Sequence, residues 1–398
     1  YERIATETLD YVLREMTGEH GAFYSSQDAD SEGEEGKFFV WTLEELEATL
    51  GEEDAERAAA YWGVSKTGNF EHGRSALHRL HKLDKHGHEA AFEELPDDII
   101  ELRERLFEAR DERVHPSTDT KVLAAWNGLM IGALAKAGFA LDEPRFVEAA
   151  DEAADFILAE MMEGELDGDF QLMRTFKEGR ARFPGYLDDF AFLAAGLLDL
   201  FEATGRPERL TQAEALVDRM VELFWDEEEG AFYFSAEHHG DLIVRQKEGH
   251  DGAVPAGNSI AIMDLLRVAE LRSRPELAER ADDALRLFYR RMRRAPQSMS
   301  EMLQALDFHA EGPAQIVLVE PAGADTEPMR NVLRTTYVPN QVDLLVDLDR
   351  IELEAWAELS PLVEGRTPRD DKPTAYVCFE GACQQPTTDP DEFRQLLG

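Results

Sequence analysis

A helical pattern that recurs along the chain constrains its fold more than any other feature of the sequence. Residues 126–161, 187–220 and 259–292 each contain an apolar helix, a break and a second helix that is apolar on one side only. The breaks fall at Pro144, Pro207 and Pro275. A helix that is apolar on every side must be covered on every side, so we expect inner helices that are sheathed by outer helices.

Short motifs connect these hairpins. The motif GAFY follows a helix at residues 21–24 and again at residues 230–233, and a weaker copy lies near residues 168–173. We expect each copy to begin a short β-excursion that leads to the next hairpin. Hairpins repeated every ~65 residues indicate a repeat architecture. The sequence therefore predicts a mainly α fold, an (α/α)6-barrel of the six-hairpin glycosidase-like kind.

The helices do not complete such a ring. Residues 2–17 form an outer helix without an inner partner, and residues 41–63 and 97–113 supply further helices. We therefore expect the barrel, in residues 1–310, to be incomplete at its N-terminal side. Because the chain starts at Tyr1 without Met, we also expect it to be a fragment of a longer protein. Residues 311–398 alternate short buried strands with helical segments, which predicts a small α/β segment.

Charge limits the partners of the chain. It carries 83 Asp and Glu against 41 Lys and Arg, a formal net charge of −42. Such a surface repels nucleic acids and anionic membranes, and no apolar run is long enough to span a membrane. Only nine of the basic residues are Lys. Acidic excess with few lysines is typical of proteins in molar salt, which screens repulsion, so we expect a salt-adapted cytoplasmic protein. An acidic mesophilic protein is the alternative.

Neither a cofactor nor a metal is expected. The two cysteines, Cys378 and Cys383, have four residues between them and match neither a Cys-x-x-Cys redox motif nor a zinc site. We therefore expect reduced thiols. The segment that begins at Asp28 resembles the start of a calcium loop, but its twelfth position is Phe39 instead of Glu, and it leads into a strand pattern, KFFVW.

Candidate functional residues lie in the loops that enter the inner helices, because these loops converge at one end of a toroid. The loops are residues 27–36, 119–128, 183–189 and 250–259, and they concentrate Asp, Asn, Trp and Gly. Carboxylates accept hydrogen bonds from hydroxyl groups, and aromatic rings cover the apolar faces of sugars. The loops therefore predict a neutral polyhydroxy ligand and suit an anionic one badly.

Paired carboxylates can act as general acid and base. We expect Asp188 or Asp189 to act together with Asp251, with His250 as a further general-base candidate. The residues expected to bind the ligand are Trp126, Asn127, Tyr186, Asn258, Asp30 and Asp119.

Structural roles remain open for several of these residues. Asp188 and Asp189 are adjacent, so on a helix they point about 100° apart, and acids in a first turn also favour the helix dipole. Asn127 and Asn258 are equally typical of caps or turns. Trp126 is as well suited to a core as to a cavity wall.

Five ordered blocks together resemble the YyaL-type family, whose animal members are called spermatogenesis-associated thioredoxin-like proteins. The resemblance implies a thioredoxin-like domain followed by an (α/α)6 barrel similar to sugar epimerases and glycosidases. This chain departs from the family where Thr120 follows Asp119, since two acids are common there, and at His115, where Arg is common. The blocks are residues 21–46, 121–138, 183–205, 251–270 and 372–390.

Two functional hypotheses follow. In the first, the chain is the barrel of a thioredoxin-domain-containing protein and forms a carbohydrate-binding or carbohydrate-active module, epimerase-like or glycosidase-like. In the second, it is a non-catalytic interaction or redox-scaffold protein that partners a thioredoxin-like domain in the same polypeptide. Inner-helix loops that surround one cavity favour the first hypothesis. Burial of Asp188 and Asp251 in packing favours the second.

Overall fold

The computed structural model describes residues 1–79, 95–166, 168–240, 244–379 and 381–398. Two compact units are present: the first contains Tyr1 and residues 25–120, and the second contains residues 2–24 and 121–398. Each unit is built around hydrophobic clusters of its own. None of the described helices is long and apolar enough to cross a membrane.

The first unit is a small helical body. Its core includes Leu46, Ala58 and Leu102, and its helices are α2 (Leu43–Leu50), α3 (Glu52–Trp62) and α4 (Asp97–Asp111). The helical segment expected over residues 41–63 forms two helices, because Gly51 has a φ of 84°, which ends α2 and starts α3. Short strands precede these helices: β1 (Tyr24–Gln27), β2 (Asp30–Ser31) and β3 (Glu34–Glu35).

The strand expected for KFFVW does not form. The backbone N–H groups of Phe39 and Val40 both donate to the carbonyl of Gly36, which makes this segment a turn. Only Trp41 makes a bridge, to Ser75. The apolar run resembles a strand in sequence, but its aromatic residues lie in a tight turn rather than in a hydrogen-bonded sheet.

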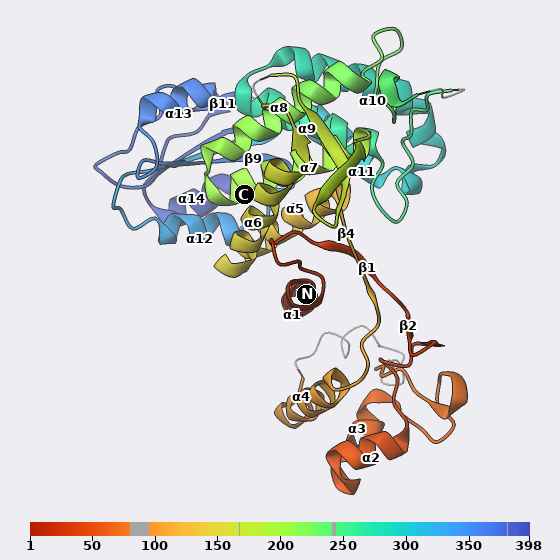
Figure 1. Cartoon of the computed structure of the whole chain (residues 1–398). Helices are drawn as coiled ribbons and strands as arrows, with labels where there is room; N and C mark the ends of the chain where they lie inside the picture. Colours follow the sequence, from red (N-terminus) through yellow and green to blue (C-terminus); the bar gives the residue numbers. More distant parts are fainter. Residues whose placement is uncertain (80–94, 167, 241–243, 380) are drawn as a thin grey trace. The chain divides into compact units, whose positions relative to one another are not determined.

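The second unit contains the three predicted hairpins, and the mainly α toroidal architecture is confirmed (Figure 1). In each hairpin the proline is the first residue of the outer helix, where its missing N–H group costs no hydrogen bond. The hairpins are α5 (Ala124–Ala140) with α6 (Pro144–Glu160), α7 (Leu187–Thr204) with α8 (Pro207–Phe224), and α9 (Gly257–Arg272) with α10 (Pro275–Arg294). The unit also contains α1 (Glu2–Glu15) and α11 (Ser300–Glu311).

Two glycines let neighbouring inner helices approach closely. A Cβ atom on Gly128 of α5 would lie 2.4 Å from the backbone of Phe192 in α7. A Cβ atom on Gly196 of α7 would lie 2.4 Å from the carbonyl oxygen of Gly128. The contact is therefore backbone to backbone, and any larger residue at either position would force the helices apart.

Short β-structure links the hairpins, as predicted. The two GAFY copies make bridges back to the preceding segment, Thr17 to Phe23 and Trp225 to Phe232. Between α6 and α7 the chain forms an antiparallel ribbon. Its strands are β5 (Met162–Glu163), β6 (Gln171–Lys177) and β7 (Arg180–Pro184), and β6 also pairs with the end of β4 (Thr118–Leu123).

The C-terminal residues form the expected α/β segment, drawn in blue in Figure 1. Its sheet has the order β11-β10-β8-β9, in which β8 and β9 are parallel and β10 is antiparallel to β8. The segment belongs to the same compact unit as the hairpins, and the domain boundary predicted after residue 310 stays a prediction. Its elements are β8 (Ala314–Glu320), α12 (Glu327–Thr335), β9 (Gln341–Asp347), α13 (Leu353–Leu359), β10 (Thr374–Phe379), β11 (Ala382–Cys383) and α14 (Pro390–Leu397).

The expectation of reduced thiols is wrong. Cys378 of β10 and Cys383 of β11 are directly opposed across an antiparallel hairpin and form a disulfide, with their Cα atoms 3.9 Å apart. Cys378 is buried and Cys383 is exposed. One nitrogen of Arg366 lies 3.1 Å from the sulfur of Cys378. The hairpin register, rather than the spacing in sequence, brings the sulfurs together.

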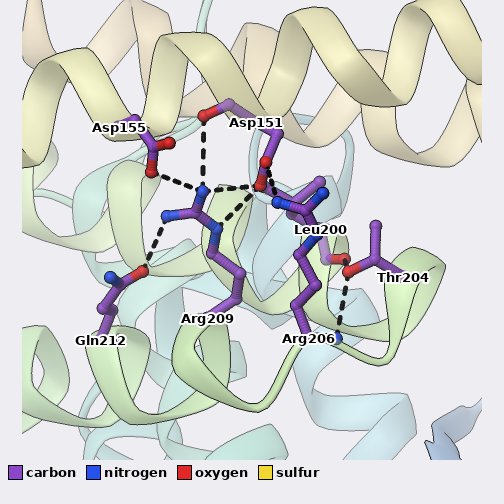
Figure 2. A network of polar contacts seen from close by, with 7 residues as sticks. All are labelled: Asp151, Asp155, Leu200, Thr204, Arg206, Arg209 and Gln212. Atoms are coloured by element: carbon purple, nitrogen blue, oxygen red, sulfur yellow. Dashed lines mark hydrogen bonds and ion pairs between the residues drawn. The ribbon is translucent and has the colours of Figure 1, made fainter. Parts of the chain in front are cut away.

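A buried ionic cluster ties the outer helices of two hairpins together (Figure 2). Arg209 of α8 is only 2% exposed and donates to both Asp151 and Asp155 of α6, at 2.6 Å in each case. It also donates to the side-chain oxygen of Gln212 at 3.0 Å, and Arg206 donates to Asp151. We call these residues the outer cluster. Every nitrogen of the Arg209 guanidinium has an acceptor.

Candidate functional site

The inner helices α7 and α9 meet at their N-terminal ends, and Asp188 lies between them. It accepts a hydrogen bond from the backbone N–H of Gly257, the first residue of α9. A Cβ atom at Gly257 would lie 2.3 Å from the Asp188 carboxylate, so only glycine leaves room for this contact. Asp188 is thus held beside α9 by the backbone.

Burial raises the pKa of Asp188 to about 7, and the nearby charges of Asp189 and Glu248 act in the same direction. Arg174 and the N–H of Gly257 oppose the shift. A carboxyl group with this pKa is present in both protonation states near neutrality, which is what general acid–base catalysis requires. Asp188 is therefore the residue at this end of the toroid that is best suited to exchange a proton with a ligand.

Asp189 faces a different neighbour. It is 1% exposed and accepts hydrogen bonds from the backbone N–H groups of Tyr186 and Ala125 and from the side chain of Arg174, at 2.9–3.2 Å. Burial raises its pKa, against the effect of Arg174. Asp189 therefore caps α7 and holds the start of α5, and it diverges from Asp188 as the helical spacing implies.

An aromatic group lies beside these carboxylates. The ring of Tyr186 stacks on Phe234 at 4.9 Å between centroids, and His239 lies 4.6 Å away on a tilted plane. The guanidinium of Arg174 lies 4.9 Å from the centre of the Tyr186 ring. Such a surface combines flat apolar faces with hydrogen-bond donors, which suits contact with a sugar ring.

The carboxylate of Asp251 also lies at the start of α9 but is occupied by the protein. It accepts hydrogen bonds from the N–H of Ala256, from the hydroxyl of Ser259 and from the N–H of Glu301, all at 2.9–3.0 Å. It thus fastens α9 to α11. The neighbouring His250 is exposed and lines a separate groove beside α10.

The two asparagines are buried and hold the GAFY copies in place. Asn127 accepts from the N–H of Phe23 and donates to its carbonyl, at 2.8 and 3.0 Å. Asn258 makes the same pair of bonds with Phe232, both at 2.9 Å. Each inner helix thus clamps the backbone of a distant β-segment, which agrees with the structural alternative open to these residues. The ligand-binding role stays a prediction.

The remaining candidates are dispersed. Trp126, at the start of α5, is 46% exposed. Asp30 is exposed in β2, and Asp119 lies in the part of β4 that belongs to the first unit. Tyr186 and Asp188 lie at the start of α7, and Asp188 and Asp251 both hydrogen-bond to residues at the start of α9, Gly257 and Ala256; their roles in a site stay predictions.

A cavity of ≈860 Å³ lies between the faces of α5, α7, α9 and α11. This volume is within the range of small-molecule sites. Its walls combine apolar side chains such as Phe192, Met263 and Phe308 with charged ones. Asp188 stands four residues before Phe192 and thus on the same face of α7.

A second ionic cluster, which we call the inner cluster, lines this cavity, and its acids and its arginine are largely buried. Asp199 of α7 pairs with Lys136 of α5 at 2.8 Å and with Arg267 of α9 at 2.9 Å. Arg267 also pairs with Glu202 at 2.9 Å. Burial would raise the pKa of Asp199, but Lys136 and Arg267 lower it below its usual range.

Asp264 of α9, the fifth member of the inner cluster, is unlike the others. It is 0% exposed, and neither of its carboxylate oxygens has a hydrogen-bond partner within the described part of the chain. Burial raises its pKa well above its ordinary value, against the effect of Arg267. An unpaired acid in the wall of a cavity costs stability, and such groups often mark functional sites. Among the described residues, no three His, Cys, Asp or Glu side chains are placed to hold a metal ion.

The sequence interpretation missed the inner cluster, although a signal was present. Lys136, Asp199, Asp264 and Arg267 interrupt helices that are otherwise apolar all round. Charged residues are almost never fully buried unless they are paired or functional. The second group missed was Arg174 with Glu248, because both lie outside the loops that enter inner helices.

The fold and site define the second unit as an α/α toroid of helical hairpins with an acidic internal cavity. The chain is 32% identical to spermatogenesis-associated protein 20 of Homo sapiens and of Mus musculus, over all of its own length and 54% of each relative. These matches confirm the predicted family. The chain spans about half the length of these curated relatives. No family model matches it.

Part of the chain is similar to part of two solved structures, an α-mannanase and a cellobiose 2-epimerase. An α-mannanase of Bacteroides thetaiotaomicron shares 17% identity and a TM-score of 0.35, over 44% of this chain and 45% of the mannanase chain. Cellobiose 2-epimerase of Spirochaeta thermophila shares 18% identity and a TM-score of 0.34, over 42% of this chain and 43% of the epimerase chain. Similarities of this size carry no information on activity.

Proposed function

We propose that the second unit binds a carbohydrate or related polyol between its inner helices and that Asp188 acts on this ligand as a general acid or base. The reaction class would be epimerisation, isomerisation or hydrolysis. The observation that carries the proposal is Asp188 itself, a partly buried carboxyl with a pKa of about 7 at the junction of two inner helices. A group of this kind is the usual signature of acid–base chemistry.

The surroundings of Asp188 support a polyhydroxy ligand. The stacked Tyr186 and Phe234 rings offer an apolar face beside it, and the cavity, which is lined by residues farther along α7 and not by Asp188 itself, supplies carboxylate acceptors. Sugars present both features, because their hydroxyl groups donate hydrogen bonds and their C–H faces pack on rings. Glu248 is the candidate for the second carboxylate, since its charge already acts on Asp188.

An NMR assay of a sugar panel in deuterated water tests this proposal. Epimerisation or isomerisation would place deuterium on the carbon next to the carbonyl, and hydrolysis would release a new reducing end. Asp188→Asn should lower turnover by about 10²–10⁴-fold, the contribution typical of one acid–base group. The same change at Asp97, an exposed first-turn acid of α4, is the matched control. Equal turnover in wild type and Asp188→Asn would contradict the role of Asp188.

A redox-scaffold function is the second candidate, and the Cys378–Cys383 disulfide favours it. Cys383 is exposed and would be accessible to a thioredoxin-like domain. Under this proposal the second unit presents a partner and turns over no sugar. Trapping of a mixed disulfide through Cys383 with a thioredoxin-like domain, together with a silent sugar panel, would favour this candidate over the first.

A further inference from the structure

A basic groove of ≈690 Å³ lies between the last turn of α10 and residues 244–250, which lead into α9. Its lining includes four basic side chains, Arg245, Lys247, Arg291 and Arg294, together with His250. Glu248 is the one acid among the described residues that line it. The chain has a net charge of −42, whereas the side chains that line this groove are mainly basic.

The cations of the groove differ in how far they are already neutralised. Lys247 lies 2.6 Å from the buried carboxylate of Asp226, and Arg245 stacks on the ring of Tyr233 at 4.0 Å. Arg291 and Arg294, by contrast, form no ion pair with any carboxylate in the described residues, and both are exposed. Two guanidinium groups are therefore available to an incoming anion.

The helix dipole alone does not explain this arrangement. Basic side chains in a last turn favour the negative end of the dipole, and Arg293 in the last turn, with Arg290 just before it, already serves that purpose. These two do not line the groove, whereas Arg291 and Arg294, three residues apart on one face, do. Arg291 and Arg294 therefore add positive charge beyond that required to balance the helix dipole.

The groove adjoins the Asp188 site. Glu248 lines the groove, and its charge also acts on Asp188. The carbonyl of Glu248 is fixed by the side chain of Asn258 at 2.8 Å. A ligand with its uncharged ring near Asp188 could thus extend a substituent toward Arg291 and Arg294.

We propose that the groove binds an anionic oxyacid group, a phosphate or a carboxylate, carried by the sugar ligand of the neighbouring site. Guanidinium groups bind such oxygens through paired, charge-assisted hydrogen bonds. The local cations are needed because the overall charge of the chain repels anions. The inference rests on the proposed function and replaces the neutral ligand expected from the loops by an anionic one.

Calorimetric titration in molar salt tests the inference with four probes: glucose, glucose phosphate, glucuronate and inorganic phosphate. We expect one of the anionic sugars to bind roughly tenfold more tightly than glucose or better. Glucose phosphate and glucuronate distinguish the two oxyacid groups. The double variant Arg291→Gln/Arg294→Gln should lose this preference. The matched control Arg290→Gln/Arg293→Gln removes the same charge from the C-terminal end of the same helix and should retain the preference.

The outcomes separate the two proposals. Loss of the preference in both double variants, or in neither, contradicts anion binding in the groove. Glucose binding without any preference for anions contradicts it too. This last result leaves the proposed function standing. Binding of inorganic phosphate that depends on Arg291 and Arg294, with no sugar bound, supports the groove and contradicts the proposed function. Absence of binding by all four probes overturns both.

Discussion

The outer and inner clusters are both ionic networks around a buried arginine, Arg209 in the first and Arg267 in the second, but they differ in how completely their groups are paired. In the outer cluster each guanidinium nitrogen of Arg209 has an acceptor on α6 or α8. In the inner cluster two cations serve Asp199 and Glu202, and Asp264 has no partner among the described residues. The outer cluster lies between packed helices, while the inner cluster lines a cavity. A complete network serves packing, and an incomplete one beside a cavity leaves acceptors for a ligand.

The largest effect is expected from breaking the outer cluster. Arg209→Met would remove the buried cation that Asp151 and Asp155 share, but Asp151 would keep Arg206 and Asp155 is 67% exposed, so we expect a loss of about 2–3 kcal/mol, below the ~3–5 kcal/mol of a fully buried pair. Chemical denaturation in molar salt measures the loss, and Arg209→Lys should lose less because it keeps the charge. An unchanged unfolding midpoint in Arg209→Met would show that the outer cluster does not hold α6 to α8.

Asp264→Asn should increase the free energy of unfolding, the opposite of the effect of Arg209→Met. It removes an acid that lacks a partner, so we expect a gain of about 1 kcal/mol near neutrality. The folded state raises the pKa of Asp264 above its ordinary value of 3.8, so wild type binds a proton that the unfolded chain releases, and its stability falls as pH rises above that value. The gain in the variant should therefore grow with pH. A loss of stability at every pH would show that Asp264 has a structural partner.

Asp188→Asn tests the N-terminal end of α7, the helix that also carries Asp199 of the inner cluster. The pKa of Asp188 is raised from 3.8 to about 7, so its contribution to wild-type stability should decline between these two pH values and stay constant above them. The variant should lack this decline, because Asn does not titrate. Denaturation midpoints measured across the same pH range check the prediction, and parallel curves for both proteins would contradict it.

The smallest effect is expected at Lys136. Its side chain is 68% exposed, and Asp199 would keep Arg267 as a partner. Lys136→Met should change stability by less than about 1 kcal/mol, the range of exposed ion pairs. A loss as large as that of Arg209→Met would mean that the inner cluster is as structural as the outer one.

The hairpins could be predicted because their signals are local. Pro144, Pro207 and Pro275 mark the starts of outer helices, and the apolar period distinguishes inner from outer helices. The break at Gly51 within residues 41–63 was left unspecified because a glycine can either continue or end a helix.

The clusters and clamps depend on tertiary packing and were beyond sequence reasoning. Asp199 meets Arg267 only because α7 packs on α9, and Asn127 meets Phe23 from 104 residues away. The disulfide depended likewise on the β10–β11 register. Asp188 could be chosen from its place before an inner helix, but its pKa follows from burial, which the sequence does not state.

Ligand-induced stabilisation of three proteins tests the central claim, that the cavity beside the inner cluster binds a polyhydroxy ligand. Thermal unfolding in molar salt would be followed with and without each sugar of the panel for wild type, Asp264→Asn and Arg209→Met. A bound ligand raises the unfolding temperature by an amount that grows with the logarithm of its free concentration divided by its dissociation constant. We predict the same rise in wild type and Arg209→Met and a reduced rise in Asp264→Asn. No rise in wild type, or an equal rise in all three, would contradict the claim.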